Sequence, residues 1–316
     1  MIPANEYLSF LDAEYLRGYV ENGGAAVKFL VPADDSVADG IVVRAAEVAD
    51  SAGFVFASVD AATTRAHLLE QVFFEVARQV DWEALAANTA REAAAAAGYP
   101  SPEGGDVTLE RLAAHYRVDA RELKRDIDRE LQRRVQRDYA MVQEFRTAML
   151  RLCQAQLRSG QIVEAEEAAV LEWLRGQLRQ ISALRSALIF RRVTRNNARH
   201  MLFSLAHWLS INGRAGLVLL LDIRRLGFAR RPSLEERQGL YYTKAALLDA
   251  YEVLRELVDN TDEMSNCLVL AVTPPTFASD PVRGLDAYQA LKFRIYDEVR
   301  DRSRDNPFSS LVRVAA

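Results

Sequence analysis

The sequence predicts an α/β protein whose parallel sheet is built from both ends of the chain, with a large helical segment inserted between them. Short apolar runs suited to buried strands occur at 25–31 and 54–61, and again at 216–222 and 266–275. Residues 81–205 instead carry apolar positions at helical spacing among many charges. The inserted helices therefore interrupt a single α/β core.

The first 80 residues give the clearest order of elements. A short amphipathic helix is expected at 5–22, ended by Gly23 and Gly24. The strand at 25–31 leads into a turn-rich segment at 32–40, and helices are expected at 41–53 and 63–80. Strand, loop, helix, strand and helix in this order are typical of a parallel α/β unit.

The rest of the chain divides into a helical part and a returning α/β part. An alanine-rich helix is expected at 81–98, and helical spacing continues from 108 to about 211. The later strands are followed by expected helices at 234–260 and 286–302. Three parts result, an N-terminal core part, a helical insertion and a C-terminal core part: 1–80, 81–205 and 206–316.

Composition restricts the class of protein. Two cysteines lie far apart, and His200 and His207 have no evident third ligand, so we expect no metal site and no disulfide framework. No apolar stretch reaches the roughly 18 residues of a membrane span, and the N-terminus does not resemble a secretory signal. We therefore expect a cytoplasmic protein without membrane contacts.

Charge is distributed unevenly along the chain. The formal net charge is −4, yet residues 1–116 carry 7 Lys/Arg and 18 Asp/Glu, and residues 117–231 carry 23 and 12. No acid occurs between Trp173 and Leu221. Asymmetry of this size bears on partner choice and association rate, not on fold.

A strand, a loop and a helix, followed later by an apolar strand ending in Asp, form the skeleton of a P-loop ATPase. VKFL (27–30), EWLRG (172–176) and the stretches 191–222 and 254–291 resemble segments of the ATP-binding proteins of bacteriophage-exclusion (BREX) systems. The resemblance implies a P-loop NTPase fold of the AAA+-like type with a large α-helical insertion. It also implies a Walker A loop after VKFL and a Walker B strand ending at Asp222.

The expected phosphate-binding loop departs from the family pattern. A Walker A loop needs glycines whose amides cradle phosphates, a Lys, and a Ser/Thr that binds Mg²⁺. In our placement Ala38 stands at the Lys position and Asp39 at the Mg²⁺-ligand position, and no lysine lies between Lys28 and Lys124. The degenerate loop includes Pro32, Asp34, Asp35, Ser36, Ala38 and Asp39. We expect this loop not to hold ATP or Mg²⁺.

The Walker B and sensor positions are also incomplete. Asp222 is kept, but Ile223 stands where the family usually has the Glu that activates water. Thr273 lies at the position of a sensor residue, and Pro274 directly after it also fits a plain turn. We therefore expect no catalytic residue, with Asp222 as a remnant or a strand-end acid.

An arginine-rich region is the main positive feature, and three interpretations stay open. It could bind the phosphates of a nucleic acid, dock an acidic partner, or pack against the acidic first third of the chain. The candidate binding residues are Arg185, Arg191, Arg192, Arg195 and Arg199.

The sequence thus favours a non-catalytic pseudo-ATPase, a scaffold or regulatory subunit of a bacterial antiviral defence complex that acts through protein–protein interaction. Expected partners are other defence-system proteins, including an active ATPase paralogue, in an oligomer, with DNA reached directly or through partners. One alternative is a nucleic-acid-binding module that uses the Arg-rich region 175–231. A second is an atypical nucleotide-binding ATPase.

Overall fold

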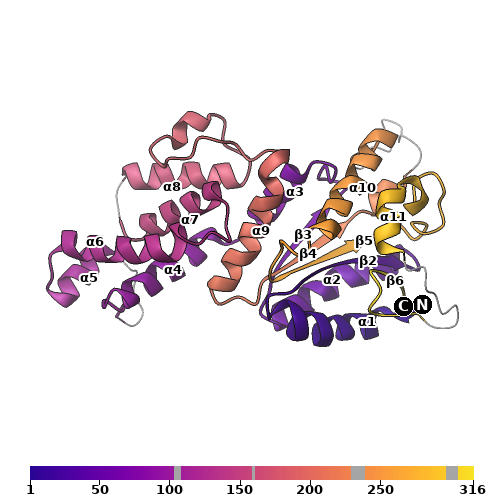
Figure 1. Cartoon of the computed structure of the whole chain (residues 1–316), viewed down its shortest axis with the longest axis horizontal. Coiled ribbons are helices and arrows are strands. Elements are labelled where there is room, and N and C mark those ends of the chain that lie inside the picture. Colours follow the sequence, from indigo (N-terminus) through magenta and orange to yellow (C-terminus); the bar gives the residue numbers. More distant parts are fainter. Residues whose placement is uncertain (103–107, 159–160, 229–238, 297–304) are drawn as a thin grey trace. The chain divides into compact units, whose positions relative to one another are not determined.

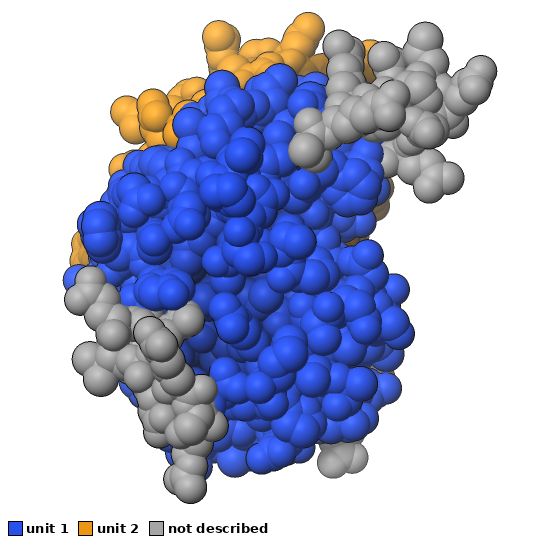
Figure 2. Space-filling view, turned by 90° about the vertical axis from the view of Figure 1, so that its right-hand side faces the viewer, with its two compact units in different colours: residues 1–76, 209–316 blue, residues 77–208 orange. Residues whose placement is uncertain are grey.

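The computed structural model describes the chain except residues 103–107, 159–160, 229–238 and 297–304. It forms two compact units (Figure 2). Unit 1 contains residues 1–76 and 209–316, and unit 2 contains residues 77–208. The interrupted unit is therefore the one that holds both ends of the chain.

Unit 1 is built on a parallel sheet with the order β1-β6-β2-β5-β4-β3 (Figure 1). β5 lies between β2 and β4 in this order. The strands β4 and β5 are almost wholly buried, because a sheet with helices on both faces needs apolar side chains on both. The strands are β1 (Ile2–Pro3), β2 (Ala25–Pro32), β3 (Val55–Asp60), β4 (Leu217–Asp222), β5 (Cys267–Val272) and β6 (Leu311–Ala315).

Helices cover both faces of this sheet (Figure 1). α1 (Ala4–Phe10), the π-helix η1 (Leu11–Val20) and α2 (Asp35–Ser51) share a buried apolar cluster with β4, β5 and β6. On the other face, Phe277 stacks on Phe29 of β2 and meets Tyr251 of α10 (Lys244–Asp259). Further elements are the 3-10 turns η4 (Arg224–Gly227) and η5 (Leu285–Ala287) and the helix α11 (Gln289–Ile295).

Unit 2 is helical in its described residues. α4 packs against α6 and α7. At the contact between α4 and α7, the ring centroids of Trp82 and Phe145 lie 6.0 Å apart. One face of α6 is fully buried through Leu123, Ile127 and Leu131. The elements are α4 (Trp82–Ala96), α5 (Leu109–Tyr116), α6 (Ala120–Leu131), η2 (Gln132–Gln136), α7 (Gln143–Gln156), α8 (Gln161–Leu174) and η3 (Ile181–Leu184). α3 (Leu69–Arg78) and α9 (Arg195–Ile211) belong partly to each unit.

The expected α/β class and parallel sheet are confirmed, and the four apolar runs form β2, β3, β4 and β5. The expected loop at 32–40 is wrong, because α2 begins at Asp35 rather than near residue 41. β6 was not expected as a strand. It is short and exposes Arg313, which weakens its apolar signal.

Three expected helices are also corrected. Helical spacing was expected to continue to about residue 211, but 175–194 is irregular except for η3. The helix expected at 234–260 begins at Lys244, with 234–238 outside the described residues. The helix expected at 286–302 is described only as α11.

Candidate functional site

The candidate site lies at the carboxyl edge of the sheet in unit 1. β3 ends at Asp60 and β4 at Asp222, and these residues are paired in register. The amino end of α2 meets this edge directly after β2. Ligands of open parallel sheets bind outside the carboxyl ends of the strands, so this edge is the natural place to look.

The connection between β2 and α2 consists of Ala33 and Asp34 alone. The carboxylate of Asp34 accepts a hydrogen bond from the backbone N–H of Val37 at 2.9 Å, so it caps the helix. A phosphate-binding loop needs several free backbone amides between strand and helix. Here the turn is short, and the Val37 amide in the first turn of α2 is used by the chain's own carboxylate.

The residues of the degenerate loop face different surroundings. Pro32 is buried at the end of β2, while Asp35, Ser36 and Asp39 are exposed on the first turns of α2. Ala38, placed at the lysine position, is fully buried in the apolar cluster between α2 and the sheet. A longer cationic side chain at this position would have to enter the core.

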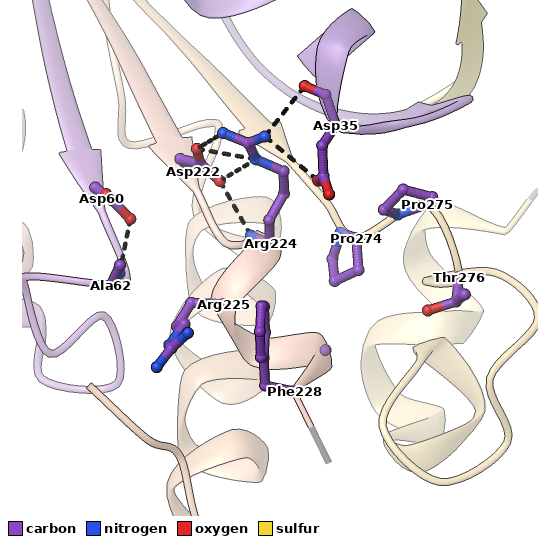
Figure 3. Close-up of a pocket in the computed structure, with 11 residues that line it drawn as sticks. Asp35, Asp60, Ala62, Asp222, Arg224, Arg225, Phe228, Pro274, Pro275 and Thr276 are labelled. Atoms are coloured by element: carbon purple, nitrogen blue, oxygen red, sulfur yellow. Dashed lines mark hydrogen bonds and ion pairs between the residues drawn. The ribbon is translucent and has the colours of Figure 1, made fainter. Parts of the chain in front are cut away.

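Arg224 occupies the space between α2 and the end of β4 (Figure 3). Its guanidinium contacts the Asp222 carboxylate at 2.6 Å and the Asp39 carboxylate at 2.8 Å. Asp35 contributes a third carboxylate at 3.4 Å and its backbone carbonyl at 3.3 Å. One arginine thus contacts three aspartates from two elements.

The electrostatics of this cluster favour the charged guanidinium. The hydrogen bond to Asp222 is the main cause that raises the pKa of Arg224 above its ordinary value, with Asp39 adding to it. The Arg224 side chain is 20% exposed, whereas the side chains of Asp35 and Asp39 are 79% and 72% exposed. Arg224 is therefore largely enclosed, whereas the side chains of Asp35 and Asp39 that contact it remain exposed to water.

A cavity of about 450 Å³ opens beside Arg224 (Figure 3). One wall is carboxylate, from Asp35, Asp60 and Asp222. The other includes Phe228, whose ring lies 4.4 Å from the Arg225 guanidinium. The remaining lining residues are Ala62, Arg224, Gly227, Pro274, Pro275 and Thr276. The cavity combines acidic and apolar surface with two guanidinium groups.

The residues expected at the positions of the Walker B glutamate and the sensor, Ile223 and Thr273, serve the sheet. Ile223 is buried, and its backbone N–H donates to the Val272 carbonyl at 2.9 Å. Thr273 is fully buried, and its hydroxyl lies 3.0 Å from the Leu30 carbonyl at the end of β2. The contacts of Thr273 therefore join β5 to β2 rather than reaching the cavity.

The expected arginine candidates separate by burial. Arg185, Arg191, Arg192 and Arg195 are exposed in unit 2, while Arg199 is half-buried on α9 beside His200. His207 contacts the Asp138 carboxylate at 2.8 Å. Within the described ranges no group of three His, Cys, Asp or Glu side chains could hold a metal ion.

Sequence reasoning did not find the role of Arg224. Two arginines, Arg224 and Arg225, directly follow Ile223 in the sequence. The available signal was an Arg two residues after a strand-end Asp, a spacing that lets one guanidinium reach back to the carboxylate. The contacts with Asp35 and Asp39 depend on the fold and could not be found in this way.

The β2–α2 unit and the Asp at the end of β4 define an α/β protein of the P-loop NTPase type. The family model described as "BREX system ATP-binding protein BrxC/D" matches residues 18–316. The chain belongs to this family of ATP-binding proteins from BREX antiviral defence systems. Neither the curated proteins nor the solved structures gave a match. None of the described helices is long and apolar enough to cross a membrane.

The residues at this edge do not fit the magnesium–triphosphate group that the family description implies. In the placement expected from the sequence, the lysine position is Ala38, which is buried, and the hydroxyl position is Asp39, which contacts Arg224. A cationic side chain already lies between the two groups that would share a metal ion. The carboxylates at this edge contact the chain's own Arg224 guanidinium, and the side chains of Asp35 and Asp39 are exposed to solvent.

Proposed function

We propose that this chain serves a BREX defence assembly by contacting other proteins, without hydrolysing ATP. The observation that supports this proposal is the Arg224 guanidinium between Asp39 and Asp222. In P-loop ATPases the corresponding hydroxyl and carboxylate hold Mg²⁺, which neutralises the phosphates. Here a residue of the chain supplies that positive charge.

The arrangement accounts for how the fold persists without a nucleotide. Arg224 joins α2 to the end of β4, a connection that in an ATPase is completed by the bound metal. A triphosphate approaching this edge would face the exposed carboxylates of Asp35 and Asp39. Two like charges about 4 Å apart near a protein surface repel by roughly 4 kcal/mol, so each acid opposes binding.

We base the scaffold role on two observations: the chain keeps the core fold of the family, and it lacks the expected Walker residues. The family match covers nearly the whole chain, and the sheet is complete in its described strands. The departures from the Walker pattern noted in the sequence lie at the phosphate-binding edge. The partners we propose are other components of the same defence system, including a catalytically active ATPase paralogue, with the scaffold presenting its surfaces to them.

Calorimetric titration with ATP and Mg²⁺ tests the loss of nucleotide binding. We expect no heat of binding at millimolar nucleotide, with an active ATPase of the same family as the positive control. Micromolar binding that Asp222→Asn abolishes would instead support the atypical-ATPase alternative.

Affinity purification from the native host tests the assembly. We expect defence-system proteins in stoichiometric amounts, retained in Asp222→Asn, because the proposed contacts do not use metal chemistry. Recovery of the chain alone, as a monomer, would contradict the proposal even if the calorimetry had shown no nucleotide binding.

A further inference from the structure

We propose that the 185–195 loop of unit 2 binds single-stranded nucleic acid. This loop lies in the segment 175–194 and the first residue of α9, where regular helix is absent except for η3. Apart from Ser186 and Thr194, its exposed side chains are of two kinds, guanidinium and large apolar. They are Arg185, Leu188, Phe190, Arg191, Arg192 and Arg195.

The loop is held in place by its other residues. Ala187, Ile189 and Val193 are buried, and they alternate with the exposed side chains. Trp173 donates its indole N–H to the Arg191 carbonyl at 3.0 Å, and Arg151 donates to the Ala187 carbonyl at 3.3 Å. The exposed side chains therefore project from an anchored backbone.

Two apolar side chains are presented to solvent by this backbone. Leu188 has φ +62°, a conformation that costs free energy for a residue with a Cβ, and its side chain is 59% exposed. Phe190 is 65% exposed two residues later. A strained leucine beside an exposed aromatic ring indicates a surface that is covered by a ligand.

The guanidinium groups around Phe190 have few internal partners. Arg191 is 80% exposed and meets Glu144 at 3.6 Å. Within the described part of the chain, Arg185, Arg192 and Arg195 form no ion pair with a carboxylate, and Arg192 donates to the Arg179 carbonyl. No acid occurs in the sequence from Trp173 to Leu221, so the positive charge is not cancelled locally.

Single-stranded nucleic acid matches both properties of the loop. Its phosphates pair with arginines, and its unpaired bases stack on an exposed aromatic ring with a tolerance for sequence. A duplex presents no free base face, and its major groove admits a helix or a β-ribbon rather than an irregular loop. An acidic protein surface would use the arginines but has no planar base to offer Phe190.

Fluorescence anisotropy with labelled oligothymidylate and the full chain tests the charge component. Each phosphate contact on a single strand contributes about 0.7 to the slope of log affinity against log salt, so Arg191→Gln with Arg192→Gln should lower the slope by about 1.4. The matched control is Arg125→Gln with Arg129→Gln, two exposed arginines of α6 that pair with neighbouring acids. This control should leave the slope unchanged.

Phe190 supplies the second arm of the test. If Phe190 stacks on one base, Phe190→Ala should lower the affinity for oligothymidylate about tenfold. Phe190→Tyr keeps an aromatic ring and should restore most of that affinity. Phe293→Ala is the control, because Phe293 is a similarly exposed ring in unit 1, at 71%. Circular dichroism of every variant should match that of the wild type.

Three outcomes would overturn the proposal. One is no change in anisotropy at low salt. Another is an equal loss in Phe190→Ala and Phe293→Ala. The third is competition by poly-L-glutamate as effective as that by unlabelled oligothymidylate, since this would assign the loop to acidic protein partners.

Discussion

Arg224 in unit 1 and Arg191 in unit 2 are both arginines beside carboxylates, yet their surroundings differ. The guanidinium of Arg224 contacts Asp222, Asp39 and Asp35, and its side chain is 20% exposed. Among the described residues Arg191 pairs with Glu144, at 3.6 Å, and its side chain is 80% exposed. The first arginine joins α2 to the end of β4, and the second leaves most of its side chain exposed. Arginine content alone does not distinguish these roles.

Removing the charge of Arg224 should have the largest effect. Arg224→Met keeps most of the side-chain volume but leaves three carboxylates without their shared cation. Loss of one member of a partly enclosed ion cluster should lower the free energy of unfolding by about 2 kcal/mol. Hydrogen exchange of the peptide covering α2 measures this at the site, since α2 carries two of the aspartates.

Arg191→Met is the matched control for this comparison, because an exposed ion pair contributes roughly 0 to 1 kcal/mol. Asp39→Asn combined with Arg224→Met should lose less than the sum of the single variants, since the substitution also removes one of the repelling carboxylates. Equal exchange rates in Arg224→Met and wild type would show that the cluster does not stabilise α2.

A buried hydroxyl offers the next test of whether this edge of the sheet is structural. Thr273→Val removes the hydroxyl 3.0 Å from the Leu30 carbonyl and keeps the branched shape. We expect a loss of about 1 kcal/mol in the free energy of unfolding, the usual net contribution of one hydrogen bond. Urea denaturation followed by circular dichroism measures it.

Thr276→Val is the control, because Thr276 is exposed at the cavity rim. A nucleotide-sensing role for Thr273 predicts the opposite pattern. In that case Thr273→Val would change nucleotide binding and leave the denaturation midpoint of the apoprotein where it is.

Lys28 makes a pH-dependent contribution to the stability of unit 1. Burial lowers the pKa of Lys28 from its ordinary value to about 8, although its ammonium donates to the Phe308 and Ser309 carbonyls. Between this value and the unfolded pKa the unfolded chain binds more protons, so stability rises with pH. From pH 7 to 9 the wild type should gain about 1 kcal/mol relative to Lys28→Met.

The difference between wild type and Lys28→Met is the quantity to measure, because other groups act in the opposite direction. Burial raises the pKa of Cys153 and Cys267, so their ionisation in the unfolded chain destabilises the fold at alkaline pH. Both proteins share this effect. A difference that stays constant from pH 7 to 9 would mean that the pKa of Lys28 is not lowered in the fold.

These tests also show what could be predicted from sequence. The buried strands were found because uninterrupted apolar runs such as 217–222 have few other interpretations. The start of α2 was missed because Pro32, Asp34 and Gly40 are turn-forming residues, whereas Asp34 uses its carboxylate to begin a helix. Local composition cannot distinguish a loop from a capped helix when both use the same residues.

The functional geometry was harder to predict than the strands. The Arg224 cluster joins residues almost 190 positions apart, so it exists only once β2 and β4 share a sheet. The segment 175–194 has apolar residues near helical spacing, but Gly176 and Leu188 adopt positive φ values that a helix excludes. Both features depend on distances and backbone angles that a pattern of residue types does not contain.

The smallest expected effect concerns Glu144, the carboxylate that pairs with Arg191 of the 185–195 loop. Glu144 competes for Arg191, so Glu144→Gln should raise oligothymidylate affinity about twofold if the 185–195 loop binds single strands. Stability should change by less than about 0.5 kcal/mol, because the pair is exposed on the Arg191 side. Glu256→Gln on α10 removes the same charge from the other unit and is the control. A gain in both variants would reflect net charge alone, whereas a gain confined to Glu144→Gln would place the phosphate at Arg191.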